Sequence, residues 1–315
     1  MHYLITGGAG FIGSNMADRL LGLGHKVTVY DGFITGHRQY LEEASKNPDF
    51  KLVEARLEDE EALNAAMKGV DFVFHFAANA DVRRGLEHPL KDLEQNTVNT
   101  ARVLEAMRKN DVKKIAFSST GSVYGEATVI PTPEDAPFPV QTSLYAASKL
   151  AGEGMIESYC EGYGFQGYIF RFVSILGERY PHGHVYDFYQ KLKKNPEELY
   201  VLGDGHQKKS YLYIQDCLDA ILTVIDKCDE KINIYNLGTD EYCEVNDSIR
   251  WITKRLGLDP KLTYSGGERG WIGDNPFIYL DTKKVRSLGW EPKYTIEQAV
   301  VKTVEYIMDN EWILE

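Results

Sequence analysis

Apolar and polar residues follow one another along the first half of the chain as short apolar runs and longer amphipathic stretches. The apolar runs are rich in β-branched and aromatic residues, which is typical of strands, whereas an apolar residue at every third or fourth position indicates a helix. The predicted strands are Tyr3–Thr6, Lys26–Tyr30, Lys51–Val53, Val70–Phe76, Lys113–Ser118 and Gly167–Val173. The predicted helices are Phe11–Leu21, Asp59–Met67, Pro89–Lys109 and Leu144–Gly164. Strands that alternate with helices favour right-handed crossovers, so the pattern predicts an α/β fold with a doubly wound parallel sheet.

Three glycines lie between the first predicted strand and the first predicted helix. They are Gly7, Gly10 and Gly13, spaced Gly-x-x-Gly-x-x-Gly. We expect Gly7 to allow a tight turn, Gly10 to let the backbone approach a diphosphate, and Gly13 to let helix and strand pack closely. Backbone N–H groups and the helix dipole would then bind the phosphates. Asp31 ends the next predicted strand, where a carboxylate binds ribose hydroxyls and repels a 2′-phosphate, so the pattern predicts NAD rather than NADP.

The pattern of predicted elements changes beyond Gly177. The predicted elements become shorter, and glycine, proline and tyrosine interrupt them more often. We therefore predict an NAD-binding Rossmann domain over residues 1–176 and a smaller mixed α/β lobe over residues 177–315 that binds the substrate. The stretch Ile232–Gly238 is expected to return to the sheet of the first domain.

Tyr145 and Lys149 carry the predicted chemistry. They are four residues apart in a predicted helix and therefore share one face. A tyrosine with a pKa near ~10 is a poor base at neutral pH. A fixed lysine cation and the positive nicotinamide ring would favour the phenolate, and a pKa lower by about three units requires roughly 4 kcal/mol. We predict that Tyr145 is the catalytic base and that Thr120, at the end of the preceding strand, bonds the same substrate hydroxyl.

Composition and charge argue against several other classes of protein. The chain has 315 residues and a formal net charge of −12, whereas a nucleic-acid binder is more often basic. Its apolar runs are too short to span a membrane, and the first strand begins too close to Met1 for a signal peptide. The four cysteines show no zinc-binding spacing. We expect a cytoplasmic enzyme with no metal site, no nucleic-acid partner and no membrane partner.

These motifs resemble those of the extended short-chain dehydrogenase/reductases, and in particular the nucleotide-sugar epimerases of the UDP-glucose (UDP-galactose) 4-epimerase kind. The resemblance covers essentially the whole chain. Its motifs are Gly7–Gly13, Asp31, Phe76–Ala78, Asn96, Asn99, Ser118–Gly125, Tyr145, Lys149, Arg171 and the stretch from Gly203 to Asp216.

The resemblance implies a set of site residues. It implies catalysis by Tyr145, Lys149 and Thr120. NAD would be bound by Gly7, Gly10, Phe11, Ile12, Gly13, Asp31, Leu57, Phe76, Ala77, Ala78, Asn96, Ser118, Tyr145, Lys149 and Phe172. A nucleotide sugar would be bound by Thr120, Ser122, Arg83, Ser174, Arg179, Val185, Lys209 and Arg269. It also implies a homodimer formed by the predicted helices Pro89–Lys109 and Leu144–Gly164, whose approach Gly152 and Gly154 would assist.

The residues after Thr120 bear on the type of reaction. The dehydratases that this chain resembles carry an Asp-Glu pair there, the decarboxylases a Glu at the second position, and the 3,5-epimerases a Cys, but this chain has Gly121 and Ser122. The resemblance therefore implies epimerisation by reversible oxidation at C4, with UDP-glucose and UDP-galactose as the first choice of substrate. Ser174 replaces a usual Asn and also fits a UDP-glucuronate 4-epimerase. Inversion at C2 of another nucleotide sugar and an NAD-dependent alcohol dehydrogenase or reductase are further alternatives.

Overall fold

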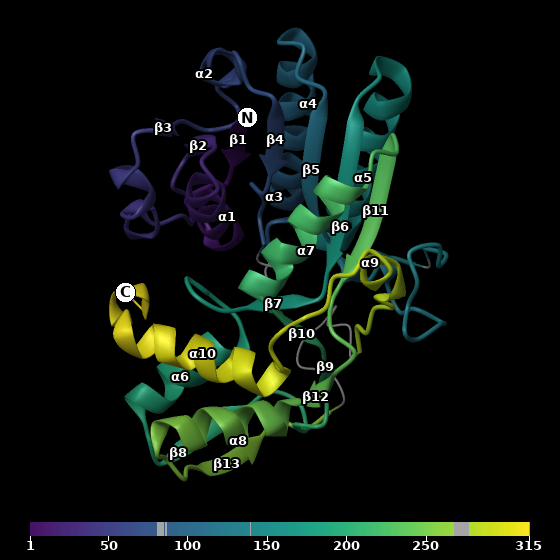
Figure 1. The fold of residues 1–315 in the computed structure, drawn as a ribbon. Coiled ribbons are helices and arrows are strands. Elements are labelled where there is room, and N and C mark those ends of the chain that lie inside the picture. Colours follow the sequence, from purple (N-terminus) through teal and green to yellow (C-terminus); the bar gives the residue numbers. More distant parts are fainter. Residues whose placement is uncertain (81–84, 86, 139, 268–276, 315) are drawn as a thin grey trace. The chain divides into compact units, whose positions relative to one another are not determined.

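The chain folds into two compact units. A computed structural model of the protein describes residues 1–315 except 81–84, 86, 139, 268–276 and 315 (Figure 1). Unit 1 consists of Met1–Val123, Ser143–Arg171 and Val224–Tyr235, and unit 2 of Tyr124–Thr142, Phe172–Thr223 and Asn236–Glu315. The predicted functional division into residues 1–176 and 177–315 remains a prediction.

A seven-stranded sheet organises unit 1, as an α/β fold requires. Its order is β11-β6-β5-β4-β1-β2-β3. The strands are β1 (His2–Thr6), β2 (Lys26–Asp31), β3 (Phe50–Glu54), β4 (Phe72–His75), β5 (Lys114–Thr120), β6 (Gln166–Phe172) and β11 (Ile232–Leu237). The ladders from β3 through β2, β1 and β4 to β5 are parallel. The strand order reverses between β1 and β4, and this switch point is where doubly wound sheets bind ligands beyond the carboxyl ends of their strands.

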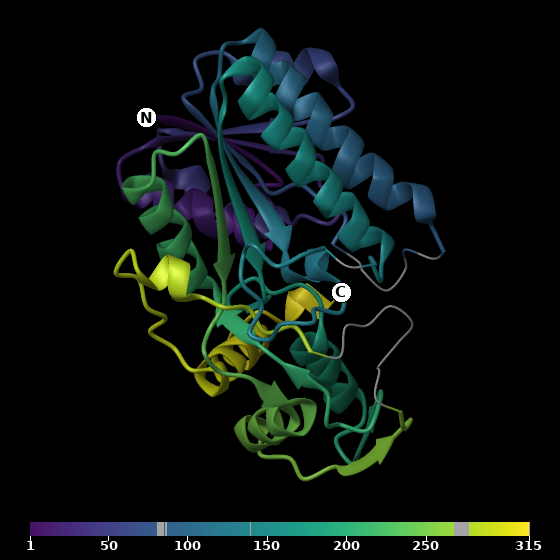
Figure 2. The same ribbon diagram turned by 90° about the vertical axis from the view of Figure 1, so that its right-hand side faces the viewer.

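Helices cover the sheet on both faces. Figure 2 shows α4 and α5 side by side on one face, with α1 on the other. The helical elements of this unit are α1 (Phe11–Gly22), η1 (Arg38–Leu41), η2 (Ala44–Lys46), α2 (Glu60–Met67), α3 (Pro89–Asp92), η4 (Leu93–Val98), α4 (Asn99–Lys109), η5 (Gly121–Tyr124) and α5 (Leu144–Tyr163). A buried apolar cluster joins α2, α4 and α5 to the strands, with members such as Leu63, Leu104 and Ile156.

The predicted single helix over residues 89–109 is wrong in one respect, because it is interrupted. α3 is followed by η4, a π-helical segment, before α4 begins. A π segment widens the turn by one residue and occurs frequently at functional sites. Here the wider turn carries Asn96, whose side chain accepts a hydrogen bond from Asn79 N at 2.7 Å.

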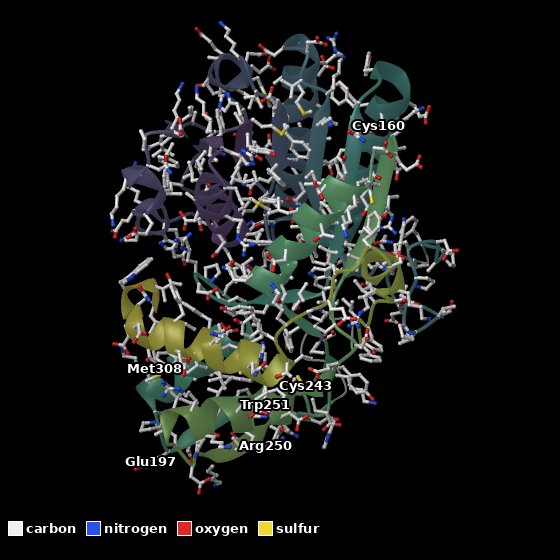
Figure 3. All side chains as sticks on the ribbon, viewed as in Figure 1. Cys160, Glu197, Cys243, Arg250, Trp251 and Met308 are labelled. Carbon is white, nitrogen blue, oxygen red and sulfur yellow. The ribbon has the colours of Figure 1, made fainter. Side chains whose placement is uncertain are left out.

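Helix α5 is fixed at both ends and along its length. Ser143 caps its start by accepting a hydrogen bond from Ala146 N at 3.1 Å, and Gly164 ends it in the left-handed conformation. A Cβ on Gly152 would lie 2.9 Å from the ring of Phe117, so this glycine serves the packing of α5 on its own sheet. Cys160, labelled in Figure 3, is buried in the same helix. The expectation that Gly152 assists a second subunit is therefore wrong.

Unit 2 contains short sheets and longer helices. Its strands pair as β7 (Ser174–Leu176) with β10 (Tyr211–Tyr213), β9 (Lys208–Lys209) with β12 (Cys243–Glu244), and β8 (Glu198–Val201) with β13 (Lys261–Tyr264). Its helices are α6 (His184–Lys194), α8 (Val245–Leu256), α9 (Lys283–Arg286), α10 (Ile296–Asp309) and η6 (Glu311–Leu314), while α7 (Ile214–Lys227) contributes to both units. In the described part of the chain no helix is both long and apolar enough to cross a bilayer.

Candidate functional site

The turn between β1 and α1 has the geometry that a bound diphosphate requires. Gly7 has φ +69°, which glycine adopts without strain, and a Cβ there would lie 2.6 Å from Ala77 N. A Cβ on Gly13 would lie only 2.3 Å from the Gly7 carbonyl oxygen. In the described part of the chain no side chain caps the start of α1 at Gly10. The open first turn and the glycine-lined cradle fit the diphosphate of a dinucleotide.

Asp31 links this turn to the end of β2. Its carboxylate accepts hydrogen bonds from Ala9 N at 2.9 Å and from Phe33 N at 2.7 Å. Burial raises the pKa of Asp31, while the two backbone N–H groups oppose that shift. A carboxylate retains further lone pairs for ribose hydroxyls. The role of Asp31 in binding the ribose remains a prediction.

The other predicted cofactor residues differ in how far their side chains are accessible. Phe11, Ile12, Phe76, Ala77 and Ala78 are partly exposed, whereas Leu57, Asn96, Ser118 and Phe172 are buried. The accessible group follows the ends of β1 and β4, at the switch point of the sheet. Arg56, two residues after β3, has an exposed side chain that pairs with Glu58 at 3.3 Å.

Tyr145 and Thr120 are hydrogen-bonded to each other. Thr120 ends β5, and its Oγ1 also accepts the Ser122 N–H at 3.1 Å. Burial raises the pKa of Tyr145, the Asp92 carboxylate raises it further, and only the hydrogen bond with Thr120 lowers it. The chain's own groups thus oppose the expected acidic phenol, because burial and the Asp92 carboxylate outweigh the hydrogen bond with Thr120. A lowered pKa would have to come from the positive charge of the bound cofactor.

Lys149 lies one helical turn beyond Tyr145 and is 2% exposed. Its ammonium donates a hydrogen bond to the Ser118 carbonyl at 2.8 Å and lies 4.7 Å from the centre of the Phe117 ring. Burial lowers the pKa of Lys149 to about 7, and the charge of Glu153 opposes that shift. Lys149 is therefore a buried cation that can lose its proton near neutral pH.

The sequence did not reveal two buried networks that support these residues. In the first, Asn96 Nδ2 donates to Ser148 Oγ at 2.9 Å, and Ser148 Oγ donates to the Tyr145 carbonyl at 2.7 Å. In the second, Glu153 pairs with Arg171 at 2.7 Å, both side chains being 2% exposed. The available signal for the second was the spacing of Tyr145, Lys149 and Glu153, which places all three on one helix face.

The predicted substrate residues of unit 2 lie on several elements. Ser174 is exposed at the start of β7, Lys209 is partly exposed in β9, and the side chain of Val185 is fully buried. Arg179 has φ +68° and hydrogen-bonds Tyr306. Any role for Val185 must therefore run through its backbone. Arg83 and Arg269 lie outside the described residues.

Unit 2 also has a surface cavity of about 580 Å³. It is lined by Cys243, Arg250 and Trp251, labelled in Figure 3, and by several carboxylates. None of the predicted site residues that the structure describes lines it. Its carboxylates would repel a diphosphate, so this cavity is a poor candidate for the nucleotide-sugar site.

Comparison with known proteins decides the family. The profile of the NAD-dependent epimerase/dehydratase family matches residues 3–238. The chain belongs to this family. The resemblance to the extended short-chain dehydrogenase/reductases is thereby confirmed, and the cofactor is NAD.

Three members of the epimerase/dehydratase family show how far the likeness extends. The UDP-glucose 4-epimerase of Mycolicibacterium smegmatis is 31% identical and covers 98% of this chain and 99% of its own length. A crystal structure of a UDP-galactose 4-epimerase is 37% identical, with a TM-score of 0.89 over 99% of this chain and all of that one. The UDP-glucose 4-epimerase of Thermus thermophilus in complex with NAD is 30% identical, with a TM-score of 0.86 over 98% and 99%. The predicted doubly wound fold is confirmed.

Proposed function

We propose that this enzyme is a nucleotide-sugar 4-epimerase that interconverts UDP-glucose and UDP-galactose by reversible oxidation at C4. The observation that carries the proposal is the hydrogen-bonded pair of Tyr145 and Thr120, with Lys149 one turn beyond. Gly121 and Ser122 follow Thr120, so neither of the next two positions carries an acid for dehydration or decarboxylation. The 4-epimerases among the relatives support the same choice.

Tyr145 and the residues around it would transfer one proton to and from the substrate. Tyr145 takes the proton of the C4 hydroxyl and later returns it, while Thr120 holds the same oxygen by a hydrogen bond. Bound NAD supplies a reversible hydride acceptor for the carbon. The cation of Lys149 favours the phenolate, because opposite charges in a buried site stabilise each other. The two buried networks, Asn96 with Ser148 and Glu153 with Arg171, hold these side chains in place. Proton transfer requires such fixed hydrogen-bond distances.

Unit 2 would bind the nucleotide part of the substrate. The protein carries a net charge of −12, so an anionic diphosphate needs local cations. Lys209 and Arg269 are the proposed diphosphate contacts, with Arg179 and Ser174 toward the sugar. Arg83, in the sequence range of unit 1, is a further proposed substrate contact. Ser174 keeps UDP-glucuronate open as the alternative substrate, with Arg179 as a basic partner for its carboxylate.

We also propose a homodimer, with α5 in the contact. The exposed face of α5 carries small residues at regular spacing, namely Ala147, Ala151, Gly154 and Ser158. Small side chains let helices approach closely, so a second copy fits this face. Light scattering at micromolar concentration should give the mass of two chains, and Ala151→Arg should give the mass of one.

The test is a substrate panel without added NAD. The purified protein is incubated separately with UDP-glucose, UDP-galactose, their N-acetyl forms and UDP-glucuronate, and the sugars are separated by chromatography. Interconversion of one pair, strongest for UDP-glucose and UDP-galactose, is expected. Dependence on added NAD with accumulation of a ketone would instead assign an alcohol dehydrogenase. Tyr145→Phe is the control for a contaminating epimerase.

A further inference from the structure

A buried ion pair between Glu153 and Arg171 lies next to Lys149 along α5. Glu153 is one turn further along α5 and accepts hydrogen bonds from Arg171 in β6. Arg171 Nη2 is 2.7 Å from Glu153 Oε2, and Nε is 3.1 and 3.3 Å from the two oxygens. Ser119 in β5 donates its hydroxyl to the same carboxylate. The carboxylate is therefore fixed from two strands.

This cluster of Lys149, Glu153 and Arg171 has a net positive charge when all three groups are ionised. It holds two cations, Lys149 and Arg171, and one anion, Glu153, all of them buried. No direct hydrogen bond joins Lys149 to Glu153 among the described contacts, because Arg171 and Ser119 occupy the carboxylate, and the ammonium donates to Ser118 instead. The charge of Glu153 acts on Lys149 through space. Arg171 is bonded to the same carboxylate at 2.7 Å.

We propose that Glu153 is a positioning residue that keeps Lys149 cationic and directed at the end of β5, and that Arg171 limits this effect. The inference deepens the proposed function and rests on it for the role of Lys149. A buried pair usually contributes little net stability compared with apolar residues, so its presence beside the site needs another reason. Control of the charge on Lys149 is such a reason.

The other charged and titratable groups around the cluster leave the effect to Glu153. They are Tyr145 and Glu157 on α5 and His75 on β4. His75 is neutral, because burial and the charge of Lys149 lower its pKa to about 3. Burial raises the pKa of Tyr145, which keeps the phenol neutral in the chain by itself. Burial also raises the pKa of Glu157.

The test is a direct titration of Lys149 in the NAD-bound enzyme. The protein is labelled with [ε-¹³C]lysine, and the Lys149 resonance is assigned by its loss in Lys149→Met. Glu153→Gln should lower the pKa of Lys149 by about 1 unit or more, and Arg171→Gln should raise it by a similar amount. The double variant with both Glu153→Gln and Arg171→Gln leaves neither charge without its partner. In it the pKa of Lys149 should be close to that of the wild type. Glu161→Gln is the matched control, since Glu161 lies in the same helix but is exposed and pairs with Lys231 at 3.0 Å.

A further variant separates the effect of the Glu153 charge from the effect of its shape. Glu153→Asp keeps the charge and should leave the pKa of Lys149 unchanged, although Gln is closer to Glu in shape. The alkaline limb of kcat should move with the Lys149 pKa, so Glu153→Gln should lose about tenfold in kcat per pH unit above the new pKa. Thermal unfolding is measured first. If Glu153→Gln does not fold, Arg171→Gln decides.

Shifts of opposite sign in the two single variants are the expected result. Equal titration of Lys149 in the wild type, Glu153→Gln and Arg171→Gln, or shifts of the same sign, would overturn the proposal. The titration needs no sugar. An enzyme that acts on none of the sugars but shows these shifts would contradict the proposed function and leave the inference standing.

Discussion

The two units differ in how their predicted functional residues are held. In unit 1, Tyr145, Lys149 and Asp31 each have hydrogen-bond partners, and Lys149 and Asp31 are buried. In unit 2, Ser174 is exposed and Lys209 is partly exposed. Buried polar networks hold a group in one geometry, whereas an exposed side chain can be exchanged at little cost in stability. We infer that unit 1 determines the chemistry and unit 2 determines which sugar undergoes it.

The largest effect should come from the proposed catalytic base. Tyr145→Phe removes the group that takes the proton, and loss of a general base costs about 10³-fold or more in kcat. NAD should remain bound, because the glycine turn and Asp31 are unchanged. Turnover of UDP-galactose and the NAD content of the purified protein check both points. Turnover within tenfold of the wild type would contradict the assignment.

The glycine cradle should give the next largest effect. Gly13→Ala places a methyl group 2.3 Å from a backbone oxygen, which cannot move aside as a flexible side chain would. Overpacking of this kind costs about 3 kcal/mol of unfolding free energy, and NAD should be lost on purification. Gly22→Ala is the matched control in the same helix: no described atom lies within 4 Å of its added Cβ. The control should gain roughly 0.5–1 kcal/mol and keep NAD.

His75 should make unit 1 sensitive to acid. It is fully buried between the hydroxyls of Thr6 and Thr100, at 2.7 and 2.9 Å, and burial lowers its pKa to about 3. The unfolded chain therefore binds the extra proton below its own pKa of about 6.5, and stability falls as the pH falls from there toward 3. At pH 5 the loss is about 2 kcal/mol.

Urea unfolding at pH 7 and pH 5 measures this loss. His75→Gln should lose about 2 kcal/mol less between the two pH values than the wild type does. His206→Gln, at an exposed position where Glu244 raises the pKa of the imidazole, should not reduce the loss. Equal acid losses in the wild type and His75→Gln would contradict the prediction.

The smallest effect should come from unit 2. Lys209→Met removes a proposed diphosphate contact and should raise KM about tenfold with kcat little changed, because the contact serves ground state and transition state equally. Lys208→Met changes the neighbouring, exposed lysine and should leave KM unchanged. A fall in kcat for Lys209→Met would mean that unit 2 also takes part in the chemistry, which would weaken the contrast between the units.

Local patterns predicted the sheet and the dinucleotide turn, because both depend on signals a few residues long. The apolar runs located the six predicted strands, and the glycine spacing located the start of α1. The π segment η4 was not predicted, because a helix of apolar period 3.6 gives no sign of one extra residue. Within this segment Asn96 bonds Asn79 and Ser148, and these residues meet only in the folded chain.

The charge state of the site could be predicted only in part. Tyr145 and Lys149 follow from their spacing, but the pKa of the phenol depends on how deeply the fold buries it, and burial acts opposite to the expected shift. Glu153 and Arg171 are 18 residues apart and meet because β6 lies next to β5 under α5. The helical spacing from Lys149 could have pointed to Glu153, but no local signal pointed to its partner Arg171. The roles of all these residues remain predictions until they are tested.

Reversible transfer of hydrogen at C4 is tested most directly by isotope retention. UDP-galactose with deuterium at C4 of the sugar is incubated with the purified enzyme without added NAD, and the product is examined by NMR and mass spectrometry. Hydride transfer to bound NAD and back to the same carbon predicts UDP-glucose that keeps its deuterium at C4. Replacement of the deuterium by solvent hydrogen, or a ketone that accumulates as NAD is consumed, would contradict it.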